Sequence, residues 1–143
     1  GGNQMSDIQQ TPVYIRRDTQ RPQYIPFPNF LMDLPLSSTA KLLYAQMLSR
    51  ALLSQKNGWM DKEGRVYILF PESEMCKAVR KGLTTVKTAL RDLEKAGLLE
   101  KAPHPHSSVN RIYLKIIPDT KTRKKKRAVN PGIRDYSYDT AGK

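Results

Sequence analysis

Apolar residues recur at three- and four-residue steps in two stretches of the chain, as they do along one face of an amphipathic helix. Residues 36–54 open with a Ser-Ser-Thr sequence that can cap a helix, and their apolar positions include Leu42, Leu43, Met47, Ala51 and Leu52. Gly82 divides the second stretch. The pattern there predicts a short helix over about 72–79 and a longer one over about 84–96, with Thr84 as the cap of the second. Two helices joined by a short Gly-containing turn are typical of a helix-turn-helix.

Strand patterns flank these two helices. Residues 65–70 are rich in β-branched and aromatic side chains and are closed by Pro71, while residues 111–117 alternate apolar and polar side chains. A polar loop of Pro, His and Ser at 103–108 separates residues 98–102 from that last strand, which predicts a hairpin. The order strand, helix, turn, helix, hairpin predicts an α+β fold, the winged helix-turn-helix, with three helices and a small antiparallel sheet or wing.

Both ends of the chain differ from this middle part. Prolines punctuate residues 6–35, so we expect an extended arm whose aromatic second half packs onto the domain or a second subunit. Beyond Pro118 a block of like charges resists folding and predicts a flexible basic tail. We therefore expect a cloning remnant and flexible arm at 1–23, a winged-helix DNA-binding domain at 24–117 and a basic linker or tail at 118–143.

The charge of the chain narrows the class of partner. It contains 25 Lys and Arg against 13 Asp and Glu, a formal net charge of +12, which attracts polyanions and releases their counterions on binding. An acidic membrane surface would suit the same charge, but no apolar run approaches the roughly 20 residues that span a bilayer, and no secretion signal opens the chain. The single cysteine agrees with a reducing compartment. These features favour a cytoplasmic protein that binds nucleic acid and no membrane.

The longer helix of the pair carries the candidate DNA-binding face. Its apolar residues gather on one side of the helix, and they are Val86, Ala89, Leu90, Leu93 and Ala96. Any surface helix has a polar face opposite its core, but this one carries cations and threonines, which can contact guanines, thymine methyl groups and phosphates. The predicted contacts of this helix and the turn before it are Arg80, Lys81, Thr84, Thr85, Lys87, Thr88, Arg91 and Lys95.

Helix-turn-helix docking assigns each of these contacts a position. The N-terminal half of a recognition helix meets base edges, so the threonines and Arg91 are expected nearest the bases, and Lys95 nearer the backbone. Arg80 and Lys81, in the turn, are expected to reach phosphates. The wing loop suits the minor groove or phosphates, through His104, His106, Ser107, Ser108 and Arg111. Non-specific contacts are expected from the tail residues Arg123, Lys124, Lys125, Lys126 and Arg127.

Catalytic and metal sites find little support in the residue pattern. The pair His104 and His106 has no second cluster of ligands at metal-binding spacing, and Cys76 has no catalytic constellation around it. Neither of the Gly-rich phosphate-binding motifs occurs. We therefore expect no enzyme activity, no catalytic residue, no metal and no cofactor. The aromatic residues Trp59, Tyr44 and Tyr67 could stack on bases, but their apolar neighbours favour the core.

Several short sequences together identify a family resemblance. They are Leu36-Ser-Ser-Thr-Ala-Lys-Leu-Leu-Tyr44, Lys56-Asn-Gly-Trp59, Val66-Tyr-Ile68, residues 86–99 and Asn110-Arg-Ile-Tyr113. Over roughly 24–117 the chain resembles the N-terminal domain of RepA-type plasmid replication initiators. The resemblance implies a winged helix that binds repeated double-stranded sites in a plasmid replication origin, commonly as a homodimer, while a separate C-terminal region engages host replication proteins. Residues 80–85 depart from the family's usual short entry to the recognition helix, so the DNA sequence bound can differ.

Two other functions fit the same fold. A winged-helix transcription repressor would use the same cationic helix at a promoter, and only the family residues favour the initiator over it. A primosome-like protein-interaction module would bind DNA with little dependence on sequence.

Overall fold

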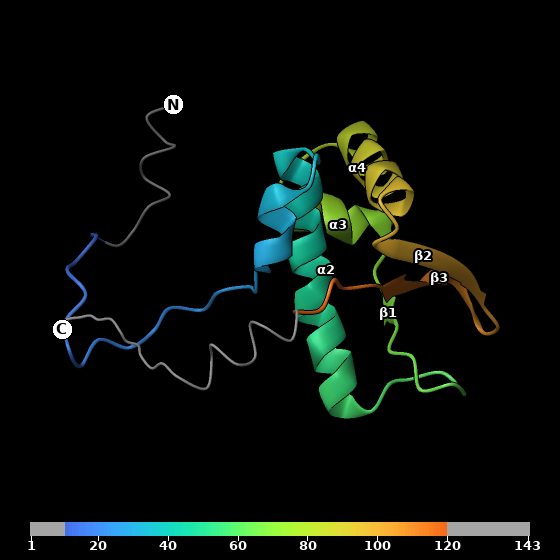
Figure 1. The fold of residues 1–143 in the computed structure, drawn as a ribbon, viewed down its shortest axis with the longest axis horizontal. Helices are drawn as coiled ribbons and strands as arrows, with labels where there is room; N and C mark the ends of the chain where they lie inside the picture. The colour runs from blue at the N-terminus through green and yellow to red at the C-terminus, as the bar shows by residue number, and fades with distance from the viewer. Residues whose placement is uncertain (1–10, 120–143) are drawn as a thin grey trace.

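The computed structural model describes residues 11–119 of the chain. A 3-10 helix, η1 (Asn29–Asp33), leads into the long helix α2 (Ser38–Asn57), and a short strand β1 (Ile68–Leu69) precedes α3 (Glu72–Val79) and α4 (Leu83–Lys95). Strands β2 (Leu99–His104) and β3 (Ser107–Leu114) then form a hairpin that projects away from the helices (Figure 1). The antiparallel sheet has the order β1-β3-β2. This arrangement confirms the predicted α+β winged helix.

Local capping defines the ends of α2. The Ser37 hydroxyl accepts a hydrogen bond from the Ala40 N–H at 3.1 Å, which satisfies one of the free N–H groups of the first turn. Gly58 ends the helix in the left-handed conformation, at φ 77°, where a side chain would be strained. The helix is therefore three residues longer at its C-terminal end than the expected 36–54. None of the helices within residues 11–119 is long and apolar enough to cross a membrane.

One hydrophobic core joins the helices to the sheet. Its largest fully buried side chains come from η1, all three α-helices and the sheet region, and they are Leu31, Leu43, Tyr44, Met47, Phe70, Met75, Val86, Leu93 and Leu99. Leu42 and Leu52 fit the helical pattern of α2 but are about half exposed, at 46% and 47%. The N-terminal arm packs onto the domain only through its last residues. Leu31 lies in the core and Phe30 packs against it, while Tyr24 is exposed.

Tyr44 ties α2 to the end of the wing. Its hydroxyl donates a hydrogen bond to the Lys115 carbonyl at 2.7 Å, and the Phe30 ring meets its own ring edge-on with centroids 5.8 Å apart. Burial raises the pKa of Tyr44 to about 12, because the ionised phenol would lose its hydration. The phenol is therefore a hydrogen-bond donor at all physiological pH values, as the contact with a carbonyl requires.

Three expected boundaries are wrong. The strand expected at 65–70 is reduced to Ile68–Leu69, and residues 111–117 form a strand only as far as Leu114. The expected polar loop at 103–108 is mostly strand, because pairing continues to His104 and Ser107 and leaves a two-residue turn. This pairing joins residues across the turn, so the composition of either segment alone did not reveal it.

The start and end of α4 also differ from expectation. The cap position is Gly82, which has no side chain to donate or accept, so Thr84 lies inside the helix rather than capping it. The helix ends at Lys95, and Ala96, expected on its buried side, is exposed at the C-cap. Gly97 follows at φ 78° and stops the helix as predicted.

We predict that Tyr44→Phe lowers the free energy of unfolding by about 1 kcal/mol, because the ring still fills the core while one hydrogen bond to the Lys115 carbonyl is lost. Urea denaturation measures this difference. Tyr14→Phe is the matched control, since Tyr14 is 81% exposed in the arm and should leave the unfolding midpoint unchanged. Equal midpoints for both variants and the parent would contradict the assigned role of the Tyr44 hydroxyl.

Candidate nucleic-acid interface

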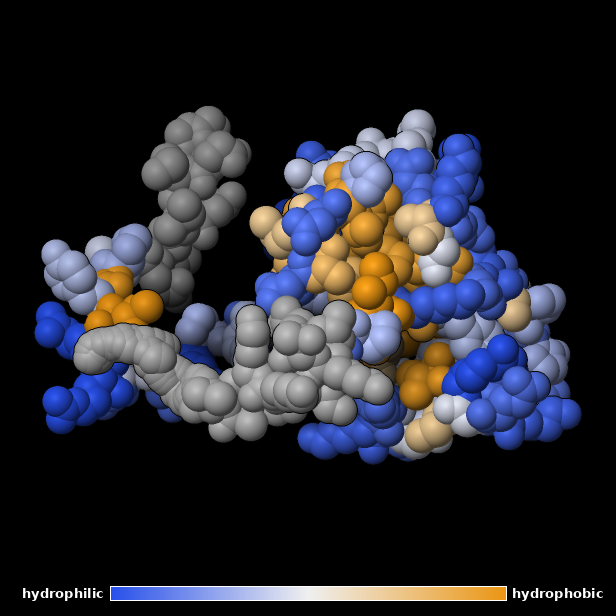
Figure 2. Space-filling view, in the orientation of Figure 1, coloured by the Kyte–Doolittle hydropathy of each residue, from blue (hydrophilic) through white to orange (hydrophobic). Residues whose placement is uncertain are grey.

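The two faces of α4 are sharply divided. Val86, Ala89, Leu90 and Leu93 are buried against the core. The side chains on the opposite side are exposed, and they are Thr84, Thr85, Thr88, Arg91 and Lys95. Figure 2 shows hydrophobic side chains gathered over the helical part of one face, while hydrophilic ones dominate over the hairpin and the outer edge of α4. Packing thus leaves the predicted recognition face accessible.

The turn between α3 and α4 holds its two cations outward. Arg80 adopts the left-handed conformation at φ 55°, and the N–H groups of Arg80 and Lys81 both donate to the Cys76 carbonyl. Both side chains are exposed. Because Gly82 offers no side chain to cap the first N–H groups of α4, the start of this helix suits an anion such as a phosphate.

Some cations near α4 form ion pairs with carboxylates of the same fold, and others do not. The Lys87 ammonium lies 3.2 Å from the Glu72 carboxylate, so this predicted DNA contact is partly neutralised within the protein. Glu94 lies 4.0 Å from Lys101 of β2. Arg80, Lys81, Arg91 and Lys95 make no ion pair with any residue in the 11–119 range. These four are the cations best placed to meet phosphates or bases.

The tip of the wing is shaped by its own side chains. The His104 Nδ1 accepts a hydrogen bond from the His106 N–H at 2.9 Å, and the Ser107 hydroxyl accepts one from the Val109 N–H at 3.0 Å. The two imidazole rings meet edge-on, with centroids 6.2 Å apart. Two of the predicted wing contacts therefore also organise the turn, while His106 and Ser108 are exposed at its surface.

Arg111 occupies a different environment from the one that its position after the wing loop suggested. Its guanidinium lies over the Tyr67 ring, 4.6 Å from the centroid, and one NH₂ group approaches the Tyr113 hydroxyl at 3.5 Å. Its Nε is buried and has no hydrogen-bond partner within residues 11–119. The side chain is half-buried against the base of the wing, toward Tyr67, rather than extended at its tip.

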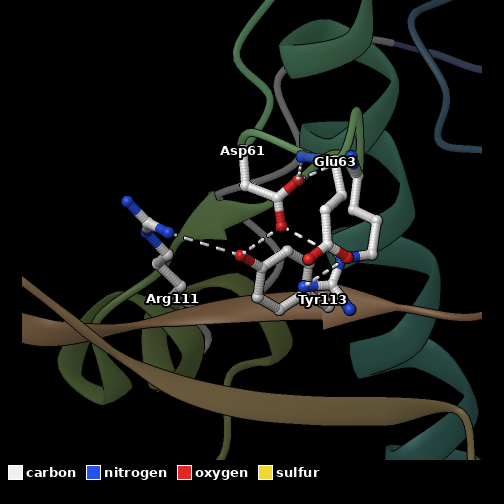
Figure 3. A network of polar contacts seen from close by, with 5 residues as sticks. Asp61, Glu63, Arg111 and Tyr113 are labelled. Carbon is white, nitrogen blue, oxygen red and sulfur yellow. Dashed lines mark hydrogen bonds and ion pairs between the residues drawn. The ribbon is translucent and has the colours of Figure 1, made fainter.

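A carboxylate links the loop before β1 to the base of the wing. The Tyr113 hydroxyl donates to Asp61 Oδ2 at 3.0 Å, and Arg65 Nε donates to the same oxygen at 3.0 Å (Figure 3). Asp61 Oδ1 accepts the N–H groups of Glu63 and Arg65, both at 2.9 Å. Led by the Arg65 N–H bond, these donors lower the pKa of Asp61 from 3.8 to about 2. The carboxylate is therefore ionised at any pH at which the protein would act.

The aromatic residues divide between the core and the surface. Tyr44 is buried as expected, but Trp59 is 56% exposed and Tyr67 is partly buried under Arg111, so the core assignment is wrong for Trp59. Sequence reasoning missed Asp61 and Tyr113 as partners. The alternation around Asn110-Arg-Ile-Tyr113 was a usable signal, because it places Arg111 and Tyr113 on one face of the strand with Ile112 on the other.

The remaining sequence expectations concern metal ligands, the cysteine and the tail. No cluster of three or more metal-ligating residues occurs within residues 11–119. Cys76 is partly buried in α3. The predicted tail contacts at 123–127 lie outside the described residues, so their role stays a prediction.

The chain matches one known protein family. Residues 23–127 match the family described as "Replication initiator protein A (RepA) N-terminus". No curated protein matches the chain.

Three solved structures have a similar fold. One described as "Structure of MDR initiator" is 27% identical, with a TM-score of 0.57 over 76% of this chain and 91% of that chain. "N-Terminal domain of DNA binding protein" is 21% identical, with a TM-score of 0.61 over 85% of this chain and 100% of that chain. "Structure of Rep-DNA complex" is 23% identical, with a TM-score of 0.58 over 76% of this chain and 91% of that chain.

We predict that the destabilisation caused by Asp61→Asn depends on pH. Folding lowers the pKa of Asp61, so its stabilisation is complete above the ordinary value of 3.8 and is lost as the pH falls through about 2. The difference in unfolding free energy between parent and variant should therefore be constant from pH 7 to pH 5 and shrink toward pH 2. Urea titrations at each pH measure it.

Asp33→Asn is the control, because the Asp33 carboxylate is exposed and makes no hydrogen bond with the residues between 11 and 119. A parent–variant difference for Asp61 that is the same at pH 2.5 and pH 7 would contradict the assigned network.

Proposed function

Because this chain belongs to the family of replication initiator protein A N-termini, we propose that it binds double-stranded DNA at repeated sites in a plasmid replication origin. The observation that carries the proposal is the exposed face of α4, where threonines and unpaired cations stand opposite a buried apolar stripe. Similar folds are described as a DNA binding protein and as a Rep-DNA complex, which supports the same partner.

The proposed complex uses α4 in the major groove and the wing beside it. Thr84, Thr85, Thr88 and Arg91 meet base edges, since they lie in the first two-thirds of the helix. Arg80, Lys81 and Lys95 neutralise phosphates. His106 and Ser108 at the wing tip meet the minor groove or the backbone. Lys87 contributes less than its charge suggests, because Glu72 competes for it.

Assembly and context extend the proposal. We propose a cytoplasmic homodimer that recruits host replication proteins and has no catalytic activity of its own. The exposed apolar residues of the arm, Val13, Tyr14 and Ile15, supply surface that a second subunit could cover. The basic tail adds sequence-independent affinity through its charge.

A DNase footprint of the full chain on the plasmid that encodes it tests the proposal. Several regularly spaced protected sites within the origin are expected. Protection of one promoter site alone would instead identify a repressor, and binding with no preferred site would indicate a protein-interaction module.

We predict that Arg91→Ala and Lys95→Ala weaken binding in different ways. Loss of Arg91 should cost about 1–3 kcal/mol on the origin repeat and less on random duplex, because a base contact carries specificity. Loss of Lys95 should weaken both duplexes alike and lower the slope of log K against log salt by about 1. Fluorescence anisotropy at several salt concentrations measures both effects.

Lys56→Ala is the matched control for a lost charge, since Lys56 lies in the last turn of α2, at the far end of this helix from α4 (Figure 1). Lys56→Ala should change neither the affinity for either duplex nor the salt slope. Equal losses on origin and random duplex for Arg91→Ala would remove Arg91 from base readout.

A further inference from the structure

The loop between α2 and β1 forms a small hairpin of its own. Met60 and Val66 pair as an isolated antiparallel bridge, and the backbone N–H of Asp61 donates to the Arg65 carbonyl at 3.0 Å. Gly64 makes the turn possible at φ 80°. We call residues 60–66 the brace. The Asp61 side chain is only 8% exposed. Its carboxylate accepts hydrogen bonds from N–H groups of the brace and from the Tyr113 hydroxyl of the wing.

Contacts run without a break from the brace to the wing tip. Asp61 bonds the Tyr113 hydroxyl, and the Arg65 guanidinium lies over the Tyr113 ring, 5.1 Å from its centroid. From there the rings of Tyr113, Tyr67, His104 and His106 follow one another, with successive centroids 6.0, 6.3 and 6.2 Å apart. Each pair lies at the spacing at which aromatic rings attract. These contacts form a continuous row from Asp61 to the wing tip.

The outer part of the wing needs such support. Strand β1 pairs with β3 only at Arg111 and Ile112, so the hairpin beyond these residues has two strands rather than three. Two-stranded ribbons twist more strongly and are marginally stable alone. On the opposite face, Ile112 and Leu99 pack on the helical core. The wing is thus held from one face by the core and from the other by the brace.

We propose that Asp61 and Tyr113 are positioning residues that fix the direction of the wing relative to α4, so that the wing tip and α4 reach the same DNA site together. They act through the ring row and do not touch DNA. This inference rests on the proposed function, in particular on contact between the wing and DNA. Tyr113 pairs with Glu100, whereas the turn of the hairpin lies between His104 and Ser107, and Asp61 lies beside Tyr113 (Figure 3).

The test compares Tyr113→Phe with Tyr24→Phe in the full chain on origin DNA. Each variant loses one hydroxyl and keeps its ring, but Tyr24 is 74% exposed in the arm, and of these two hydroxyls only that of Tyr113 has a hydrogen-bond partner among residues 11–119. Hydroxyl-radical footprinting reports the flank covered by the wing, methylation protection reports the major groove under α4, and anisotropy gives the affinity. Circular dichroism sets a temperature at which both variants are folded.

Tyr113→Phe should bind about three- to tenfold more weakly, since the hydrogen bond to Asp61 and the longer contact with Arg111 are both lost. Protection of the wing flank should fade while methylation protection under α4 and the salt slope persist, because no phosphate contact is removed. Tyr24→Phe should match the parent. Asp61→Asn, which keeps the size of the side chain but discharges it beside Arg65, should reproduce the loss on the flank.

Two results would overturn the inference. One is an unchanged wing footprint in both Tyr113→Phe and Asp61→Asn, and the other is a uniform loss of protection under the wing and α4 together. If the parent protein protects no origin sequence at all, the proposed function fails before the brace is tested, so the two failures are distinguishable.

Discussion

The packing of α2 through the middle of the domain is the constraint on which the other elements depend. Leu43, Tyr44 and Met47 are fully buried, and their side of the helix meets α3, α4 and the sheet together. The buried stripe of α4 packs against α2, α3 and β2, so the rotation of α4 about its axis follows from the core. Exposure of its cationic face is a consequence of that rotation. The same helix holds the wing through the Tyr44 hydroxyl and the Lys115 carbonyl.

Local patterns in the sequence are sufficient to predict the helices, but they do not predict the extent of the wing strands or the contacts at their base. The boundaries of α3 follow from Pro71 and the acidic first turn, and the burial of α4 follows from its apolar spacing. The hairpin is harder to predict, because Pro103 and Pro105 are typical of a loop. Only the pairing of His104 with Ser107 shows that the strands continue to the turn. The Asp61 to Tyr113 bond spans 52 positions, and no local period can indicate a contact at that separation.

Charge on this protein is better described by its pairing than by its total. The net charge of +12 includes cations that bind carboxylates within the fold, such as Lys87 on Glu72 and Arg65 on Asp61. What remains beside α4 is a small set of unpaired groups, with Arg91 and Lys95 on the helix. Internal pairing therefore leaves fewer cations available to a polyanion than the 25 Lys and Arg of the sequence suggest.

The left-handed conformation of Arg80 carries a consequence for how this interface evolves. A residue with a Cβ in that conformation costs about 1–2 kcal/mol relative to right-handed backbone, and glycine would relieve most of this strain. The chain nevertheless holds a guanidinium there, beside the start of α4. Selection for stability alone would favour glycine, whereas selection for polyanion binding would favour arginine, so the two pressures oppose each other at this single position.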